Sequence, residues 1–291
     1  MDATASQLHN ALSKNFQELS PQLKQAARYI LDNRADVATH SLRQIARRSG
    51  LTPPTFSRLA RAVGFDGYEN LKDVCRSELK RNSMTLAQRA FAMQDNPGDT
   101  QKNRGSFAER HAASTVENIT QLIGNLDLEY LADIADRLAT AKKVILVGAL
   151  SSRAILEYLH HMMGIANPGW TVMTDSQHSS SSLLSEVDEE TVVLVVSIQP
   201  YIRRTVQIAE LTSTYGASII SITDDISSPV LKHSSHSILV PTDSPQFFPS
   251  YVAVLTLLEI LTGMVVRRWG DEANKRIDSV EKTAHAIGDY I

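Results

Sequence analysis

The sequence predicts two domains of different fold class, an all-helical N-terminal domain joined to an α/β domain with a five-stranded parallel sheet flanked by helices. Apolar residues recur at helical spacing up to about residue 80, and β-branched apolar runs alternate with helical segments after residue 113. A polar stretch with the turn signal Asn96-Pro97-Gly98-Asp99 lies between them. We therefore expect a helical domain at 1–81, a linker at 82–112 and an α/β domain at 113–291.

The N-terminal segment carries start and stop signals for four helices. Apolar residues at helical spacing predict the first helix within 8–19, and Ser20-Pro21 supplies an N-cap and a first-turn proline for the second. Ser41 is expected to cap the third helix, and Gly50 to end it. Thr52-Pro53 then opens the fourth helix.

The third and fourth helices match the pattern of a helix-turn-helix. Ala46 is small enough for two helices to cross closely, and Gly50 permits the tight turn between them. The apolar positions of the pattern are Ile45, Leu51, Phe56 and Leu59. The fourth helix has one apolar face, formed by Phe56, Leu59, Ala60 and Val63. Its opposite face is therefore predicted to be free to enter a DNA groove.

Hydroxyl and guanidinium side chains gather around that face. The predicted DNA contacts are Arg47, Arg48, Thr52, Thr55, Ser57, Arg58 and Arg61. We expect Arg58 to contact a base, because its fork can bind guanine with two hydrogen bonds. Arg47 and Arg48 are expected to meet backbone phosphates. The alternative is that these arginines only solvate an ordinary helix.

The charge distribution favours the DNA interpretation. The whole chain has a formal net charge of −3. Residues 1–110 contain 17 Lys/Arg and 11 Asp/Glu, whereas residues 111–291 contain 12 and 21. The basic half fits a polyanionic partner and the acidic half does not, although two solvated surfaces that differ by chance give the same numbers.

The second half of the sequence has the spacing of repeated βαβ units. The predicted strands are 144–147, 170–173, 192–197, 218–223 and 237–240. Continuous apolar runs at intervals of roughly 20–27 residues suit a parallel sheet covered on both faces. Such sheets bind ligands beyond the carboxyl ends of their strands.

Hydroxyl side chains follow two of these strand ends. Ser151 and Ser152 open a helix directly after the first strand, where hydroxyls and free N–H groups can hold an anion. After the third strand, Ser197, Tyr201, Arg203 and Thr205 are candidates to bind an anionic or polyol ligand. The alternatives to ligand binding are that the two serines only cap their helix and that Arg203 is an ordinary surface residue. The glycines of a dinucleotide-binding fingerprint are absent, so no nucleotide cofactor is expected.

Other features exclude further classes of protein. Cys75 is the only cysteine, which rules out an internal disulfide and a multi-cysteine zinc site. The histidines lack the spacing of a metal site or a catalytic triad, so we expect no metal, no cofactor and no catalytic residue. The N-terminus has no secretory signal, and no apolar run that lacks a charged residue is long enough to span a bilayer. The chain is therefore predicted to be cytoplasmic.

At the level of whole motifs, the sequence resembles a known family. Residues 20–80 resemble the N-terminal domain of the RpiR (MurR/RpiR) family of bacterial transcriptional regulators, above all in the stretch HSLRQIARRSGLTPPTFSRLARAVGFDGYENLKD. The segment from Gly64 to Lys72 looks like that family's G-F-x-G-F/Y-x-x-L-K/R motif. Residues from about 130 to 270 resemble the family's sugar isomerase (SIS) domain. The resemblance implies a regulator of sugar-catabolic genes that senses a phosphosugar.

The resemblance also carries over to single residues. Ser151 and Ser152 match the family's phosphate-loop serines, and Ser197 matches the first serine of the second ligand loop. The usual S-x-S-G-x-T pattern is broken, because Gln199, Pro200 and Ile202 replace its second serine, glycine and threonine. The loop looks instead like a P-Y-S-R-x-T variant, with Ile202 in place of that serine. The departure bears on the effector and not on the regulator class.

We therefore predict a transcriptional regulator that binds double-stranded DNA and is controlled by a small effector, expected to be a sugar phosphate. A homodimer or homotetramer would read an inverted repeat. Segments 251–266 and 277–291 are candidate oligomer contacts, and Ser250-Tyr251 is a candidate for facing the ligand or a second subunit. One alternative is a sugar-phosphate isomerase with an accessory helical domain, for which Glu157, Glu259 and the loop histidines are available as acid and base but show no evident pairing. The other is a sugar-binding adaptor without DNA binding.

Overall fold

In the computed structural model the first described residue is Leu19, at the end of the first predicted helix. The described residues are 19–94, 104–173 and 177–289. The helix expected within 8–19 thus lies outside the described residues, apart from Leu19, which is buried. None of the helices in the described ranges is long and apolar enough to cross a membrane.

Internal contacts divide the chain into two compact units. The first unit comprises Met1–Asn125 and Asp243–Ser250, and the second comprises Leu126–Thr242 and Tyr251–Ile291. The short segment Asp243–Ser250 therefore groups with the N-terminal unit, although the chain on either side of it belongs to the second unit. The division at residues 81 and 112 stays a prediction.

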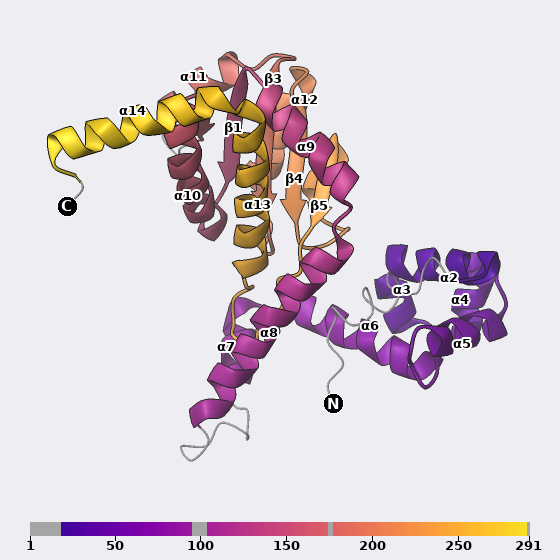
Figure 1. Ribbon diagram of the computed structural model, residues 1–291. Coiled ribbons are helices and arrows are strands. Elements are labelled where there is room, and N and C mark those ends of the chain that lie inside the picture. The colour runs from indigo at the N-terminus through magenta and orange to yellow at the C-terminus, as the bar shows by residue number, and fades with distance from the viewer. Residues whose placement is uncertain (1–18, 95–103, 174–176, 290–291) are drawn as a thin grey trace. The chain divides into compact units, whose positions relative to one another are not determined.

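The described part of the first unit contains helices and no strands, as the sequence predicts (Figure 1). The helices are α2 (Pro21–Asp32), α3 (Arg34–Thr39), α4 (Leu42–Ser49), α5 (Pro53–Ala62), α6 (Tyr68–Ser83), α7 (Leu86–Gln94) and α8 (Arg104–Asn125). Helices α4 and α5 are the predicted helix-turn-helix pair. The stretch expected as a linker contains α7 and the start of α8.

A single apolar core holds α2 to α6 together. Phe56 lies at its centre, fully buried, with its ring edge-on to Tyr29 and Tyr68 at centroid distances of 6.2 and 6.1 Å. The predicted inward face of α5 is confirmed, because Phe56, Leu59, Ala60 and Val63 are all buried. A buried face leaves α5 with one exposed side, as the helix-turn-helix pattern requires.

The ends of α4 follow the sequence signals closely. Ser41 forms a capping box with Gln44, in which the Ser41 hydroxyl accepts from the Gln44 amide and the Gln44 side chain accepts from the Ser41 amide. Gly50 adopts the left-handed conformation at φ 70°, which a residue with a Cβ rarely adopts.

Two predicted caps are wrong in detail. Ser20 and Thr52 occupy N-cap positions, but neither side chain accepts a capping hydrogen bond. In α5, Pro53 and Pro54 remove the N–H groups of the first two positions. The next amide, of Thr55, donates to the carbonyl of Thr52, and the Thr52 hydroxyl bonds the Thr55 hydroxyl at 2.9 Å.

The second unit is the predicted α/β domain. Its strands are β1 (Lys143–Gly148), β2 (Trp170–Val172), β3 (Thr191–Ser197), β4 (Ser218–Thr223) and β5 (His236–Leu239). They form one parallel sheet in the order β2-β1-β3-β4-β5, which confirms the five predicted strands. The helices are α9 (Leu128–Thr140), α10 (Ser151–Ala166), α11 (Gln177–Ser185), α12 (Arg203–Thr214), α13 (Val252–Trp269) and α14 (Asp271–Ile287). A short 3₁₀ helix covers Pro229–His233.

Helices cover both faces of this sheet (Figure 1). Ile145 and Val193 pack with Ala209 of α12 in one buried cluster, to which α11 also contributes. Figure 1 shows α9, α10 and α13 on the other face. Since both faces are covered, the central strand β3 is buried along its whole length.

The strand order creates a switch point between β1 and β3. From β1 the chain crosses to β2 on one side, and from β3 it crosses to β4 on the other. The carboxyl ends of β1 and β3 are therefore adjacent, with Gly148 opposite Val196. A Cβ on Gly148 would lie 3.0 Å from Cβ and 3.2 Å from the backbone carbonyl carbon of Ser152, so glycine allows the start of α10 to pack closely against the end of β1. Ligands of parallel α/β sheets bind at such a switch point.

We expect Ser41→Ala to destabilise the N-terminal unit by about 1 kcal/mol, because the substitution removes the hydroxyl acceptor of the capping box. The measurement is chemical unfolding of the full chain, together with hydrogen exchange of the Gln44 amide. Ser57→Ala, which alters no cap, is the matched control. Unchanged exchange at Gln44 in Ser41→Ala would contradict the role of this cap.

Candidate DNA-binding and effector-binding sites

The exposed side of the helix-turn-helix carries most of the predicted DNA contacts. Arg47, Arg58, Arg61 and Thr52 are exposed, and Ser57 is half-buried. Arg47 lies in the last turn of α4, whereas Arg58 lies in the middle of α5. Hydroxyls at the start of α5 and guanidinium groups along it match the needs of phosphate positioning and base contact.

Two of the predicted residues are placed differently from the rest. Thr55 is only 2% exposed, and its hydroxyl faces that of Thr52, so Thr55 is placed to orient Thr52 and not to reach a base. Arg48 is exposed but forms an ion pair of 2.5 Å with Asp36 of α3. A phosphate would therefore compete with Asp36 for this guanidinium.

The sequence reasoning overlooked Arg43, an exposed residue in the first turn of α4. Its signal was its spacing, because Arg43 lies four residues before Arg47 and so shares a helix face with it. Together the two extend the basic surface along α4. Exposure thus includes Arg43 in the basic surface of the helix-turn-helix, whereas burial excludes Thr55 from it.

At the end of β1, one of the two predicted serines is already engaged. Ser151 is half-buried in the first turn of α10, after Leu150, a non-glycine residue with a positive φ of 52°. Ser152 is only 3% exposed, and its hydroxyl lies 3.0 Å from the hydroxyl of Tyr251. The amides of Ser152 and Arg153 donate to the carbonyls of Ala149 and Leu150. Ser151 is therefore the more available of the pair for a ligand.

The loop after β3 forms a second cluster. Tyr201 donates its hydroxyl to Oδ1 of Asp224 at 3.0 Å, and the Gln199 amide donates to Oδ2 at 3.2 Å. The Ser197 hydroxyl is buried and has no hydrogen-bond partner among the described residues. An orphaned hydroxyl at a strand end is a group that a ligand can satisfy.

The remaining predicted residues of this loop lie in the first turn of α12. Thr205 is buried and Arg203 is exposed. Arg204, beside it, donates to the hydroxyl of Ser180 in α11 at 3.2 Å. The structure thus pairs Ser152 with Tyr251 and Tyr201 with Asp224, but within the described residues it shows no hydrogen bond that joins Ser151 or Arg203 to either pair.

Asp224 is the residue of this site that the sequence reasoning missed. It directly follows β4 and so stands at the same sheet edge as Ser197, which pairs with Thr223. Burial raises the pKa of the Asp224 carboxyl, against the hydrogen bonds from Gln199 and Tyr201. Burial also raises the pKa of the Tyr201 hydroxyl, and the Asp224 charge raises it further. An aspartate at the end of a parallel strand was the signal that was available.

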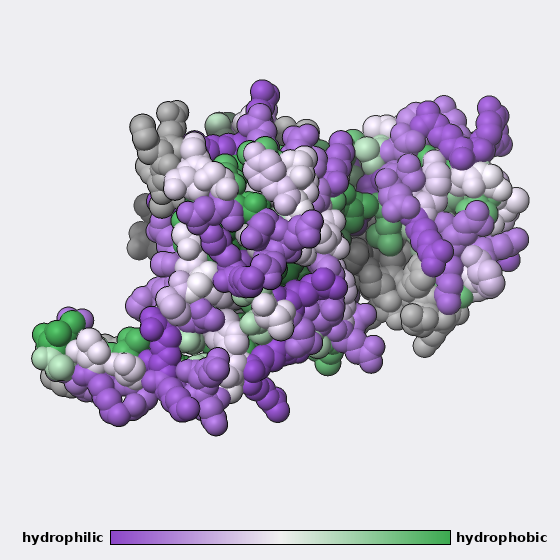
Figure 2. All heavy atoms as spheres, turned by 90° about the horizontal axis from the view of Figure 1, so that it is seen from above, coloured by the Kyte–Doolittle hydropathy of each residue, from purple (hydrophilic) through white to green (hydrophobic). Residues whose placement is uncertain are grey.

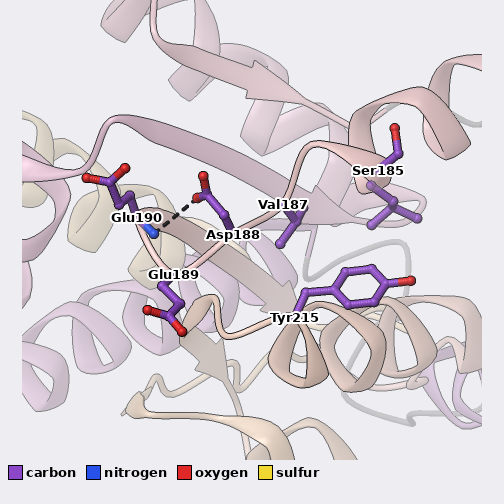
Figure 3. Close-up of a pocket in the computed structure, with 7 residues that line it drawn as sticks. Ser185, Val187, Asp188, Glu189, Glu190 and Tyr215 are labelled. Carbon is purple, nitrogen blue, oxygen red and sulfur yellow. Dashed lines mark hydrogen bonds between the residues drawn. The ribbon is translucent and has the colours of Figure 1, made fainter.

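A cavity of about 730 Å³ lies at the opposite end of the strands (Figure 3). Asp188, Glu189 and Glu190 line it just before β3 begins, and Tyr215 lines it before β4. A hydrogen bond from Thr191 lowers the pKa of Asp188. A lining of carboxylates repels an anionic ligand. None of the predicted effector residues borders this cavity.

Comparison with known proteins resolves the family. A model described as "Helix-turn-helix domain, rpiR family" matches residues 6–82, and a model of the SIS domain matches residues 137–264. The chain combines a helix-turn-helix domain of the rpiR family with a SIS domain. The order of the two domains is the one that the sequence motifs predicted, and the structure has the helix-turn-helix and the five-stranded parallel sheet of that expectation.

Several relatives of this chain are transcriptional regulators by name. An uncharacterised HTH-type transcriptional regulator of Clostridium perfringens is 22% identical, over 89% of this chain and 91% of its own. Among solved structures, the Vibrio vulnificus NanR protein complexed with ManNAc-6P has a TM-score of 0.57 at 18% identity, covering 97% of this chain and 98% of that one. The sugar isomerase domain of an RpiR transcription factor from Sphaerobacter thermophilus has a TM-score of 0.57 at 20% identity, covering 60% and 98%. The regulator class is thereby favoured over the isomerase alternative.

The raised pKa of Asp224 predicts a pH-dependent stability. Above about pH 4 the carboxyl ionises in the unfolded chain before it ionises in the folded one, so the folded state binds more protons. The free energy of unfolding should therefore fall as pH rises from about 4 towards the folded pKa. Asp224→Asn should remove this contribution.

The measurement is urea unfolding of the full chain at a series of pH values. Asp225→Asn, a change in the neighbouring carboxylate, is the matched control and should keep the slope of the wild type. Identical pH profiles for Asp224→Asn and the wild type would contradict the burial of an ionisable Asp224.

Proposed function

We propose that this protein is a cytoplasmic transcriptional regulator of sugar or related carbon catabolism. It binds double-stranded DNA through α4 and α5, and a small anionic sugar derivative bound at the carboxyl ends of β1, β3 and β4 controls that binding. The observation that carries the proposal is the exposed row of Arg47, Arg58 and Arg61 on a helix pair whose other side is fully buried.

In this proposal α5 enters the major groove. Arg58 contacts a base edge, Thr52 and Ser57 contact phosphates near the start of the helix, and Arg47 holds the backbone. Two copies related by a two-fold axis then read an inverted repeat, because the symmetry of the half-sites follows that of the protein. Arg48 joins the contacts only when a phosphate displaces Asp36.

The effector class follows from the donors at the sheet edge and from the likeness to NanR. The NanR structure contains ManNAc-6P, a phosphosugar, which supports a ligand of the same class here. Ser151 and Ser197 provide hydroxyls, and Arg203 provides a charge for the anionic group. The Tyr201–Asp224 pair offers a carboxylate to sugar hydroxyls.

The two glutamates available to the isomerase alternative are both engaged, Glu157 within α10 and Glu259 between α13 and α10. Glu157 pairs with Arg153 at 2.8 Å on α10, and Glu259 accepts from Tyr158 at 2.9 Å. General base catalysis needs a carboxylate within reach of the substrate proton. Neither glutamate contacts Tyr201, Asp224 or Ser197 in any hydrogen bond of the described residues.

The segment 243–250 offers a route from the effector to the DNA-binding unit. The carbonyl of Asp243 accepts hydrogen bonds from Asn118 at 2.7 Å and from Ser114 at 3.0 Å, both on α8. Tyr251, which follows the segment directly, bonds Ser152. Since Tyr251 is the next residue in the chain after segment 243–250, an effector that displaces Tyr251 also shifts this segment, which is hydrogen-bonded to α8. Control of this kind requires that the effector bind the two states with different affinity.

We expect Arg58→Ala to weaken binding to a selected operator by about 1–3 kcal/mol and to relax the choice of base at one position of each half-site. Arg58→Lys keeps the charge but loses the two-pronged geometry, so it should retain non-specific binding and lose base preference. The measurement is fluorescence anisotropy on an operator selected from random DNA.

Arg267→Ala, an exposed arginine of α13, is the control and should leave DNA affinity unchanged. Failure of the wild type to select any sequence would overturn the proposed function itself.

We expect Asn118→Ala to uncouple the two activities. A thermal-shift screen of the full chain against sugar phosphates and the same sugars without phosphate identifies a working ligand, which should raise the melting temperature of wild type and variant alike. That ligand should change the DNA affinity of the wild type but change that of Asn118→Ala far less.

Thr120→Ala, also on α8 but exposed, is the matched control. Full retention of the effector response in Asn118→Ala would contradict the route through Asp243. A response to unphosphorylated sugars alone would contradict the phosphosugar class.

A further inference from the structure

The last helix of the chain carries an apolar row for which the second unit provides little cover. In α14 only Ala273 is buried, and the helix is 17 residues long. Its apolar row consists of Ala273, Ile277, Val280, Ala284 and Ile287. The intervals along this row are four, three, four and three residues, which is the heptad spacing of a coiled-coil seam.

Contacts with the rest of the second unit are concentrated in the first turns of α14. Ala273 is 1% exposed, and Arg276 donates to the carbonyl of Gly164 at the end of α10. Further along, the side-chain hydrogen bonds from Lys282 to Asp278 and from Thr283 to Ser279 stay within α14. Figure 1 shows this second half extending beyond α10.

The row becomes more exposed towards the end of the helix. Ile277, Val280 and Ala284 are half-buried, and Ile287 is 68% exposed. Figure 2 shows apolar surface at the far end of α14, with both hydrophilic and weakly apolar side chains along the rest of the helix. A row of apolar side chains at heptad spacing that ends in an exposed isoleucine has the pattern of a coiled-coil seam.

The charges that flank the row favour a second copy of α14 in parallel. With Ile277 and Ala284 at a positions, Arg276 occupies a g position and Glu281 the following e position. In a parallel pair these two meet across the seam as opposite charges. In an antiparallel pair g faces g and e faces e, so Arg276 and Glu281 do not meet.

We propose that α14 is a self-association surface, in which two copies of the chain pair their α14 helices in parallel and in register about a two-fold axis. The seam consists of Ile277, Val280, Ala284 and Ile287. This rests on the proposed function and deepens its dimer by naming the surface, and it uses an isologous contact of the kind that closes a two-fold pair. The outer face carries both Asp278 and Lys282, so it lacks the one-sided basic character of a membrane-binding helix.

The first test is sedimentation velocity of the full chain over a range of concentrations. Val280→Glu puts a charge into the seam and should raise the dimer dissociation constant about tenfold or more. Ser279→Glu places the same charge one residue away, outside the seam, and should leave the constant unchanged. Circular dichroism of both variants checks that the fold is kept.

The second test fixes orientation and register by disulfide trapping. The only native cysteine, Cys75, is buried, so an introduced cysteine reports alone. Ile287→Cys should form an intermolecular disulfide under mild oxidation, because identical d positions meet only in a parallel, in-register pair. Ser279→Cys should not.

The possible results separate the surface from the proposed dimer. A dimer that Val280→Glu leaves intact, or one in which Ile287→Cys forms no intermolecular disulfide, would overturn the α14 surface while the dimer stands. A wild-type monomer at all concentrations would overturn both. Disruption by Val280→Glu together with trapping only through Ile287→Cys is the expected result.

Discussion

The parallel pairing of β1 with β3 is the interaction on which the second unit depends. Its register sets Lys143 opposite Thr191 and Gly148 opposite Val196, and it makes both strands central in the sheet. Since the chain then leaves β1 and β3 in opposite directions, their following loops cannot be covered by a single crossover. The same pairing therefore produces the rigid core and the open edge at which Ser151 and Ser197 stand.

In the first unit the equivalent constraint is the packing of the buried face of α5 against its neighbouring helices. Phe56 fills the space between the aromatic rings of Tyr29 and Tyr68, and Gly50 allows the chain to turn back on it. With one face of α5 fixed in this way, the exposure of Arg58 and Arg61 is not independent of the core. One face of α5 stabilises the helix pair, and the opposite face carries the arginines predicted to contact DNA.

The small net charge of the chain hides the contrast between these two units. The basic side chains that face outward on α4 and α5 belong to one fold, whereas the carboxylates that line the cavity before β3 belong to the other. Repulsion from DNA phosphates would hold such an acidic surface away from the operator. The net charge of −3 is therefore the sum of a basic N-terminal half and an acidic C-terminal half.

The sequence by itself determined the order of the five strands and the place of the helix-turn-helix, but not α3 or α6. Apolar runs predicted the five strands, and apolar spacing together with Ala46 and Gly50 predicted the helix-turn-helix and the buried face of α5, because these patterns are local in the sequence. Local signals also predicted the Ser41 cap and the Gly50 turn, which depend on neighbours a few residues away. For the candidate effector site, the sequence predicted the loops after β1 and β3 but not the contacts of their individual side chains.

Tertiary structure alone decided what each of those side chains does. Thr55 is turned inward, Arg48 meets Asp36, and Ser152 meets Tyr251. Asp224 became part of the site through residues 23 and 25 positions away, Tyr201 and Gln199. Such contacts join segments that are distant in the sequence, so no local pattern encodes them. Spacing fixed which loops meet at the sheet edge, and packing fixed which hydroxyl there was left for a ligand.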